Sequence, residues 1–151
     1  MNKLICTLIL TVIISGGCLT TMSFNDESAQ KGRTNLMNAI DDERINEVWY
    51  RMSYKIRDTT NFKHFESNWQ EIAANLKNIL EGQILSNREV ETDDKLPGNV
   101  LKIASEKHIV RVLFVAELDR ARFPGEDEVV WRFRGEYNDK DKTLTSGFIP
   151  K

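Results

Sequence analysis

The side chains that most often perform acid–base or metal chemistry are few in this sequence. Its two histidines, His64 and His108, each follow a lysine, and neither stands in a HxxxH or HxxE spacing. A zinc site needs several nitrogen or sulfur ligands, so we predict two solvated imidazoles and no bound metal. Asp41, Asp42 and Glu43 could pair for acid–base work. At the start of a helix they would instead stabilise its dipole, which is the interpretation we favour.

Motifs of nucleophilic catalysis and of phosphate binding are missing. The sequence has no G-x-S-x-G elbow and no glycine-rich phosphate loop. The stretch 138–141 (NDKD) has the look of a calcium loop, but it lacks the central Gly and the closing Glu, so we predict a hairpin turn. The sequence therefore predicts no enzyme and no cofactor.

Two groups of side chains could bind a ligand. Four arginines lie close together across a predicted hairpin: Arg120, Arg122, Arg132 and Arg134. They could hold an anion, a phospholipid head group or an acidic partner. Acidic residues alternate with them, so we favour a solvated, ion-paired sheet face. Trp49 and Trp69 either pack in the core or line a ligand cleft.

Cys18 is the residue with the clearest predicted chemistry. Lys3 opens the chain, an apolar run extends over 4–14, and the small residues 15–17 precede the cysteine. This run is shorter than the ~20 residues that span a bilayer, and it suits the apolar region of a signal peptide. The segment resembles a bacterial lipoprotein signal, in which cleavage before the Cys is followed by its acylation. Cleavage would also remove Cys6, and acylation would block a thiol that is a liability in an oxidising compartment.

Alternatives to lipidation remain open for this segment. Ser15 stands where lipoprotein signals prefer Leu, and Ser15 and Gly17 also satisfy the small-x-small rule of ordinary signal peptidase. That cut would release a soluble periplasmic protein, and a third outcome is a retained membrane anchor. We favour the lipoprotein. Leu19, where Asp would favour the inner membrane, points to the outer membrane.

Length and charge indicate one exported domain. The chain has 151 residues, with 21 Lys+Arg against 23 Asp+Glu. A weakly acidic chain lacks the basic surface that binds nucleic acid. We expect a signal peptide over 1–17, a lipid-anchored tether over 18–33 and a single domain over 34–151.

Hydrophobic periodicity places helices before strands in this domain. A period of 3.6 predicts helices over 34–40, 43–56 and 62–80, and Gly82 follows as a left-handed cap. A period of 2 then predicts the strands, over 84–92, 99–104, 108–121, 129–137 and near 143–150. Helices followed by an antiparallel sheet with one covered face define an α+β fold.

The turn at 124–125 predicts a register for the strongest hairpin. Leu118 would lie opposite Trp131 on a buried face, and Glu117 opposite Arg132 as an ion pair on a solvent-exposed face.

The order and spacing of several short motifs resemble the bacterial domain of unknown function 4019, a family of small exported proteins, many of them lipoproteins. The motifs are IDDERINEVW (40–49), ESNWQEI (66–72), SNREV (86–90), LPG (96–98) and SGFIP (146–150). The resemblance covers roughly 36–150. It departs at Leu144 and at Gly147-Phe148, where the family usually has Trp and Gly-Tyr. It implies N-terminal helices packed on one face of a curved antiparallel sheet, similar to a cystatin-like or nuclear-transport-factor-2-like cone, and it implies no catalytic residues.

These expectations favour a non-enzymatic, lipid-anchored envelope protein facing the periplasm. It would bind a protein partner or small ligand with its sheet face or cone pocket, and the membrane through Cys18. The alternative is a periplasmic immunity or inhibitor protein that occludes a toxin or hydrolase. A third possibility is a degraded or unusual hydrolase.

Overall fold

Helices precede an antiparallel sheet along the chain, as the hydrophobic periods predict. The computed structural model describes residues 28–119, 128–140, 144–145 and 147–151. The helices are α2 (Ala29–Asp41), α3 (Ile45–Tyr50), α4 (Tyr54–Arg57), α5 (Phe62–Ser67) and α6 (Trp69–Leu80). The strands are β1 (Gln83–Glu91), β2 (Pro97–Ala104), β3 (Ile109–Leu118), β4 (Val129–Tyr137) and β5 (Leu144–Thr145). The predicted α+β class is confirmed. The predictions for Cys18, Arg120, Arg122 and the turn at 124–125 lie outside the described residues.

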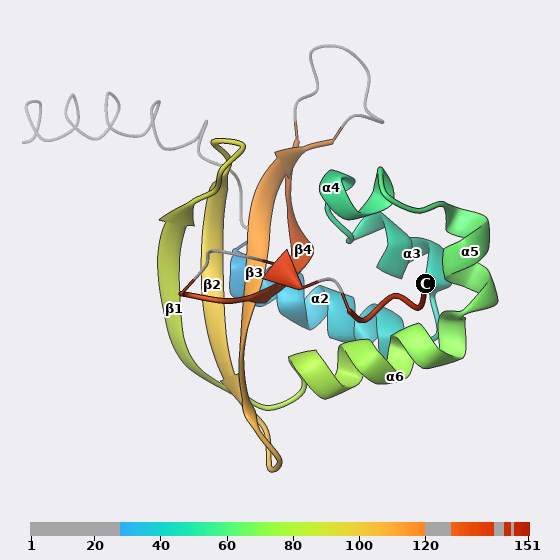
Figure 1. Cartoon of the computed structure of the whole chain (residues 1–151), viewed down its shortest axis with the longest axis horizontal. Helices are drawn as coiled ribbons and strands as arrows, with labels where there is room; N and C mark the ends of the chain where they lie inside the picture. The colour runs from blue at the N-terminus through green and yellow to red at the C-terminus, as the bar shows by residue number, and fades with distance from the viewer. Residues whose placement is uncertain (1–27, 120–127, 141–143, 146) are drawn as a thin grey trace, which may run out of the picture.

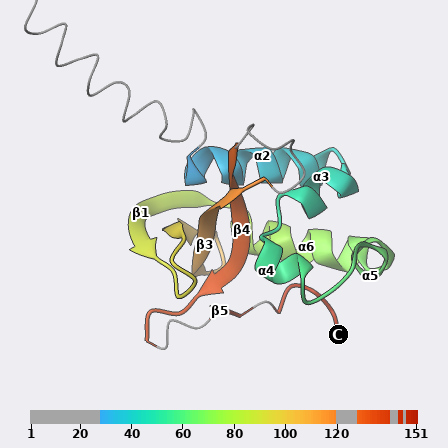
Figure 2. The ribbon, with the colours of Figure 1, turned by 90° about the horizontal axis from the view of Figure 1, so that it is seen from above.

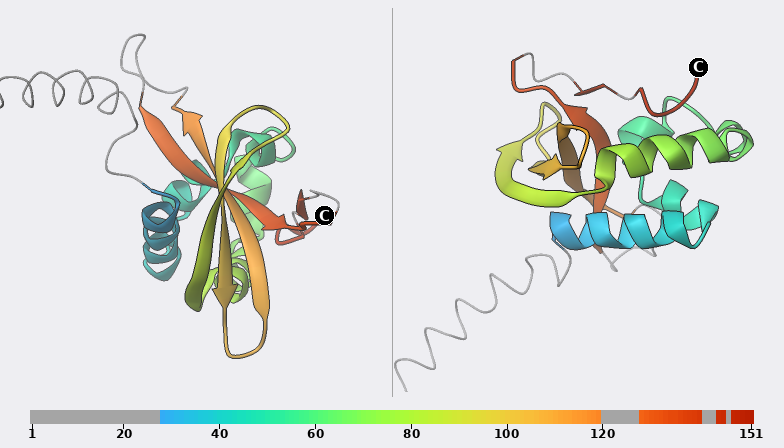
Figure 3. Two further views of the ribbon diagram at one scale, coloured as in Figure 1. Left: turned by 90° about the vertical axis from the view of Figure 1, so that its left-hand side faces the viewer. Right: turned by 90° about the horizontal axis from the view of Figure 1, so that it is seen from below.

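The sheet has the order β1-β2-β3-β4-β5 with antiparallel neighbours and is not closed. Helices α2 and α6 pack on one face of it: α2 passes behind the strands in Figure 1, and the remaining helices gather beside them. Helix α2 contacts β2, β3 and β4, while α6 packs on both α2 and β3. Figures 2 and 3 show the same arrangement from above, from the side and from below, with the strands strongly twisted. Among the described residues, no helix is both long and apolar enough to cross a bilayer.

The main core lies between the helices and one face of the sheet. Buried residues of α6 (Ile72, Leu76) meet buried residues of the strands, among them Phe114 and Phe133, whose rings lie 5.6 Å apart at the centroids. Burial of such side chains supplies most of the driving force for folding. A second, smaller apolar cluster holds Val100, Leu113 and Val115, with Val90 and Tyr137 against it.

Helix α2 begins five residues before the predicted domain boundary at Thr34. Ser28 caps it, its hydroxyl accepting the N–H of Lys31 at 3.2 Å. Ala29 and Gly32 are buried, and a Cβ on Gly32 would lie 3.1 Å from both the Cβ and the carbonyl oxygen of Trp131. These small residues allow the helix to approach the sheet closely. They also hide the helical period from a hydrophobicity pattern, so the pattern places 29–33 in the tether.

The predicted helix over 43–56 is wrong as a single element. Met52 forms a parallel bridge with Phe133. The Ser53 N–H donates to the Phe133 carbonyl at 2.9 Å, and the Phe133 N–H donates to the Arg51 carbonyl at 2.9 Å. The chain therefore pairs with the edge of β4 between α3 and α4, which interrupts the helix.

The acidic residues 41–43 do not begin a helix, so their predicted position is also wrong. Helix α2 continues to Asp41 because Ala39 and Ile40 are buried, and Asp42 is its C-cap. Asp41 instead pairs with Lys77 of α6 at 2.6 Å. The predicted helix over 62–80 is likewise divided, into α5 and α6.

The β3–β4 register differs from the predicted one by two residues. Leu118 lies opposite Val129, and Glu117 lies opposite Val130. This even difference holds from Phe114 to Leu118, so the side chains there keep their predicted faces. Beyond the bulge at Arg134 the difference falls to one residue. The environments nevertheless differ: Glu117 and Arg132 are buried, and Leu118 is 56% exposed. The predicted solvent-exposed face is therefore wrong, because the chain around α4 covers this end of the sheet.

Candidate functional site

A hollow of about 550 Å³ lies where the end of β3 meets α4 and the turn between β1 and β2. Its lining is Tyr54, Lys55, Asp58, Asp94, Leu96, Glu117, Leu118 and Arg134. These residues come from four separate segments of the chain, so only the folded domain brings them together. Charged and apolar side chains share the lining, which is typical of a binding site.

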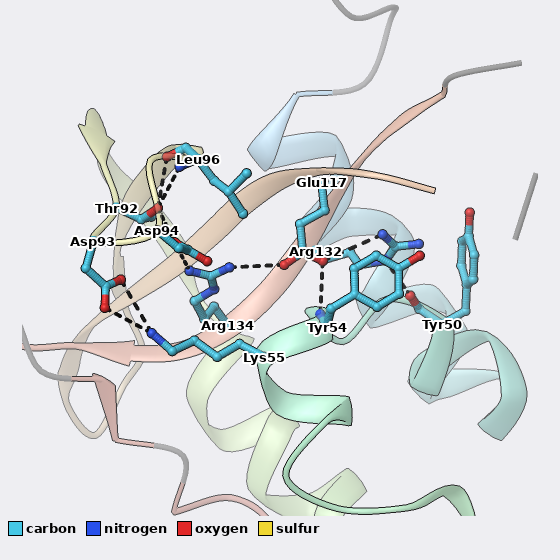
Figure 4. Close-up of polar contacts among 10 residues, drawn as sticks. All are labelled: Tyr50, Tyr54, Lys55, Thr92, Asp93, Asp94, Leu96, Glu117, Arg132 and Arg134. Carbon is cyan, nitrogen blue, oxygen red and sulfur yellow. Dashed lines mark hydrogen bonds and ion pairs between the residues drawn. The ribbon is translucent and has the colours of Figure 1, made fainter. Parts of the chain in front are cut away.

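Arg134 is the buried cation of this hollow. It falls at a bulge in β4, between the residues that pair with Leu113 and Phe114, and it is only 2% exposed. One terminal nitrogen donates to Oδ1 of Asp94 at 2.7 Å, and the other donates to Oε1 of Glu117 at 3.1 Å. Burial alone would lower the pKa of Arg134, but the bonds to these two carboxylates raise it above its ordinary value. The guanidinium is therefore held charged and in one place, and Figure 4 shows its bonds to Asp94 and Glu117.

Glu117 joins this cation to a second buried arginine. The Glu117 side chain is only 4% exposed, and its Oε2 accepts the backbone N–H of Tyr54 at 3.0 Å. The same oxygen lies 3.6 Å from a terminal nitrogen of Arg132. Both carboxylate oxygens are thus engaged within the protein.

Arg132 is fully buried between two tyrosine rings. Its guanidinium carbon lies 4.8 Å from the ring centre of Tyr50 and 4.6 Å from that of Tyr54, within cation–π range. Its Nε donates to the carbonyl of Tyr50 at 2.9 Å. The Tyr50 hydroxyl donates to Asp119 at 2.7 Å, and burial together with this bond raises the pKa of Tyr50 to about 12. Arg132 and Tyr50 thus pack behind Tyr54 and Glu117, which line the hollow. Figure 4 shows Arg132 with the Tyr50 and Tyr54 side chains.

The turn between β1 and β2 supplies the opposite rim. The Thr92 hydroxyl donates to Asp94 and accepts the N–H of Leu96 at 2.9 Å, which fixes the turn. The bond from Arg134 lowers the pKa of Asp94 to about 2. Beside it, Lys55 and Asp93 form an exposed ion pair at 3.1 Å. At neutral pH the Asp94 carboxylate therefore stays negative and the Arg134 guanidinium stays positive.

The tryptophans singled out in the sequence pack with core side chains. Trp69 is 7% exposed and belongs to the main core. Trp49 is partly buried, and its ring centre lies 5.9 Å from that of Phe62 and 5.1 Å from that of Phe65.

Neither histidine is fully solvated, contrary to the prediction. His64 is half-buried, and its Nε2 hydrogen-bonds the carbonyl oxygen of Pro150 at 2.9 Å. His108 is half-buried beside Ser105. Within the described ranges, no three or more His, Cys, Asp or Glu side chains gather as a metal site would require.

The sequence indicated Arg132 and Arg134 but missed their surroundings. The pattern predicts a solvated face for both and does not indicate their contacts with Asp94 and Tyr54. The signal for this arrangement is the pair of arginines that alternates with Trp131 and Phe133, beside a strand that contains Glu117.

Comparisons of the chain with protein-family models, with curated proteins and with solved structures found no match. The resemblance to domain of unknown function 4019 therefore stays a prediction from residue spacing.

Proposed function

We propose that this protein is a non-enzymatic, lipid-anchored protein of the bacterial envelope whose domain binds a protein partner or small ligand in the hollow beside Arg134. The observation that carries the proposal is the prebuilt wall of this hollow. Arg134 and Glu117 are buried and locked by ion pairs, whereas Leu118, a large apolar residue in the lining, is 56% exposed. A rigid polar wall beside exposed apolar surface is typical of binding sites.

The ionisation of the site supports binding over catalysis. General acid–base catalysis works best with a group whose pKa lies near the operating pH. The pKa of Asp94 is lowered to about 2 and that of Tyr50 is raised to about 12, so neither group exchanges a proton near neutrality. Both oxygens of Glu117 already accept bonds from the protein. These groups are therefore suited to fixing the shape of a binding site and not to transferring protons.

Capture from detergent-solubilised envelopes tests this function. The C-terminally tagged full chain is compared with Leu118→Lys and with Leu85→Lys, since Leu85 is also an exposed leucine of the sheet, at 48%. The same co-purifying protein, or small ligand seen by native mass spectrometry, should accompany the unchanged chain and Leu85→Lys, and it should be lost from Leu118→Lys. Equal recovery with all three would show that the hollow is not the binding site.

A further inference from the structure

We infer that the sheet face turned away from α2, at the β2–β3 hairpin, lies against the anionic headgroups of the phospholipid membrane that anchors the chain. This contact goes beyond the proposed function and depends on it only for the membrane anchor. Three features support it: a row of cations on this outer face, an exposed isoleucine beside them, and the position of the hairpin at the end of the domain.

The strand register places cations on the outer face. Leu101 and Val112 belong to the main core, so their neighbours Lys102 and Arg111 point to the opposite side of the sheet. Lys102 and Arg111 lie directly opposite each other in the β2–β3 ladder. Like charges in such a pair repel at close range and lower the stability of a sheet. Anionic groups outside the protein would offset this repulsion.

The carboxylates near this row do not neutralise it. Asp139 is shared by two cations, since it pairs with Arg111 at 3.1 Å and also with Arg88 of β1. Within the part of the chain that the structure describes, Lys102 has no ion-pair partner. The described charged residues around the row and the hairpin turn are Arg88, Lys102, Lys107, Arg111 and Lys140 against Glu106, Glu136 and Asp139. Five positive charges against three negative ones leave a net +2, in a chain whose net charge is −2.

An exposed isoleucine shares the outer face with these cations. Ile109 stands two residues before Arg111, so both side chains point to the same side, and Ile109 is 58% exposed. The β2–β3 hairpin that carries it projects beyond the helices in Figure 1. An apolar side chain among basic ones is typical of surfaces that insert shallowly into anionic membranes. A free phosphate ion would match the cations but would leave Ile109 in water, so we name a lipid surface as the partner.

The predicted anchor would keep this face within reach of the membrane. Ser28 caps α2, so only residues 18–27 separate the predicted lipid from the domain, a span of at most ~35 Å. Each cation near an anionic surface contributes a small part of the attraction. Two net charges therefore suffice to orient a domain that is already anchored, and they hold a free domain only weakly.

Sedimentation with lipid vesicles tests the inference. Residues 18–151 with Cys18→Ser, which include every described residue, are mixed at low salt with sucrose-loaded vesicles. One set contains equal parts of phosphatidylglycerol and phosphatidylcholine, and the other contains phosphatidylcholine alone. The protein should partition about tenfold better onto the anionic vesicles and should be released as the salt concentration rises.

Variants of the same chain assign the binding to the outer face. Lys102→Gln should lower the partition coefficient on anionic vesicles about fivefold, because it removes one cation. Lys63→Gln is the matched control, since it removes an exposed lysine of α5 and should leave the coefficient unchanged. Ile109→Ser should also lower it, because less apolar surface is buried in the membrane. Equal melting temperatures of the variants would show that folding is preserved.

The inference would be overturned by an absence of binding, by equal binding to both kinds of vesicle, or by equal effects of Lys102→Gln and Lys63→Gln. Inorganic phosphate that competes more strongly than sodium chloride at the same ionic strength would also overturn it, because that result would indicate a site for a free anion. None of these outcomes bears on the hollow, which the envelope capture tests, or on the acylation of Cys18, which cell fractionation tests.

Discussion

Glu117 holds together the buried charges of this protein at the scale of single residues. It accepts a bond from Arg134 at 3.1 Å and one from the backbone of Tyr54 at 3.0 Å, and it lies 3.6 Å from Arg132. Buried ion pairs add little net stability, but removal of one partner leaves a desolvated charge uncompensated. The stability of the fold should therefore depend strongly on the charge of Glu117.

Replacing Glu117 by Gln should lower the free energy of unfolding by about 3–5 kcal/mol. The amide keeps the size of the side chain and loses the charge that faces both arginines. Urea denaturation followed by circular dichroism measures the change. Asp93→Asn is the control, since it breaks an exposed pair with Lys55 and should cost no more than about 1 kcal/mol. Equal, small losses for the two variants would contradict a structural role for the network.

Because of Asp94, the free energy of unfolding should fall at acidic pH. Its pKa is about 2 in the folded chain against an ordinary 3.8. A lowered pKa stabilises the fold above the ordinary value, and this stabilisation is lost as the pH falls from about 4 to about 2. The difference in unfolding free energy between the unchanged chain and Asp94→Asn should therefore be constant from pH 5 to 8 and should shrink toward pH 2. Urea titrations at several pH values measure it, and a difference independent of pH would refute the ion pair with Arg134.

The junction between α6 and β1 is the point at which helical layer and sheet are joined. Gly82 lies there with a φ of 130°, as its predicted role after the helix requires. A Cβ at this position would meet the carbonyl oxygen of Ala104 at 2.2 Å. The Arg33 side chain donates to the carbonyls of Leu80 and Gly82, the latter at 2.7 Å, so α2 also fastens this junction.

Gly82→Ala should lower the free energy of unfolding by about 2–3 kcal/mol, because both the left-handed backbone and the close carbonyl oppose a side chain. Thermal unfolding measures the loss. Gly147→Ala is the matched control, since a Cβ there has nothing within 4 Å, and it should change stability by less than about 0.5 kcal/mol. An equal effect of the two substitutions would contradict the strained junction.

Elements whose ends and faces are set by neighbouring residues could be predicted from the sequence. Elements whose ends depend on contacts with distant parts of the chain could not. The apolar stripe of α6 is regular, so the sequence places Trp69, Ile72 and Leu76 on one face, and all three are buried. The break at Met52 depends on the edge of β4, far along the chain. The start of α2 has a local signal in its cap, Ser28, but its close approach to the sheet depends on the contact between Gly32 and Trp131.

The candidate site follows the same rule. Strand alternation gave the correct faces for Glu117 and Arg132, because a register error of two preserves them. Their burial depends on Tyr50 and Tyr54, which come from helices that a strand pattern does not contain. The hollow itself needs the β1–β2 turn as its rim, a contact that no local pattern specifies.

At the scale of the whole molecule, the start of α2 shortens the predicted tether. If the mature chain begins at Cys18, only residues 18–27 separate the lipid from the capping residue Ser28, instead of the predicted 18–33. Ten residues can span at most ~35 Å. The domain would then lie close to the membrane surface.

Replacement of Cys18 by Ser tests this arrangement in cells. The acylated cysteine would be the membrane attachment of the mature protein, so Cys18→Ser should move the protein from the membrane fraction to the soluble fraction of the envelope. Cys6→Ser is the matched control, because Cys6 lies in the predicted signal peptide and its loss should leave the protein on the membrane. Fractionation and immunoblotting against the C-terminal tag measure both. A Cys18→Ser protein that stays on the membrane would point to a retained anchor, and an unchanged protein that is already soluble would point to cleavage without lipidation.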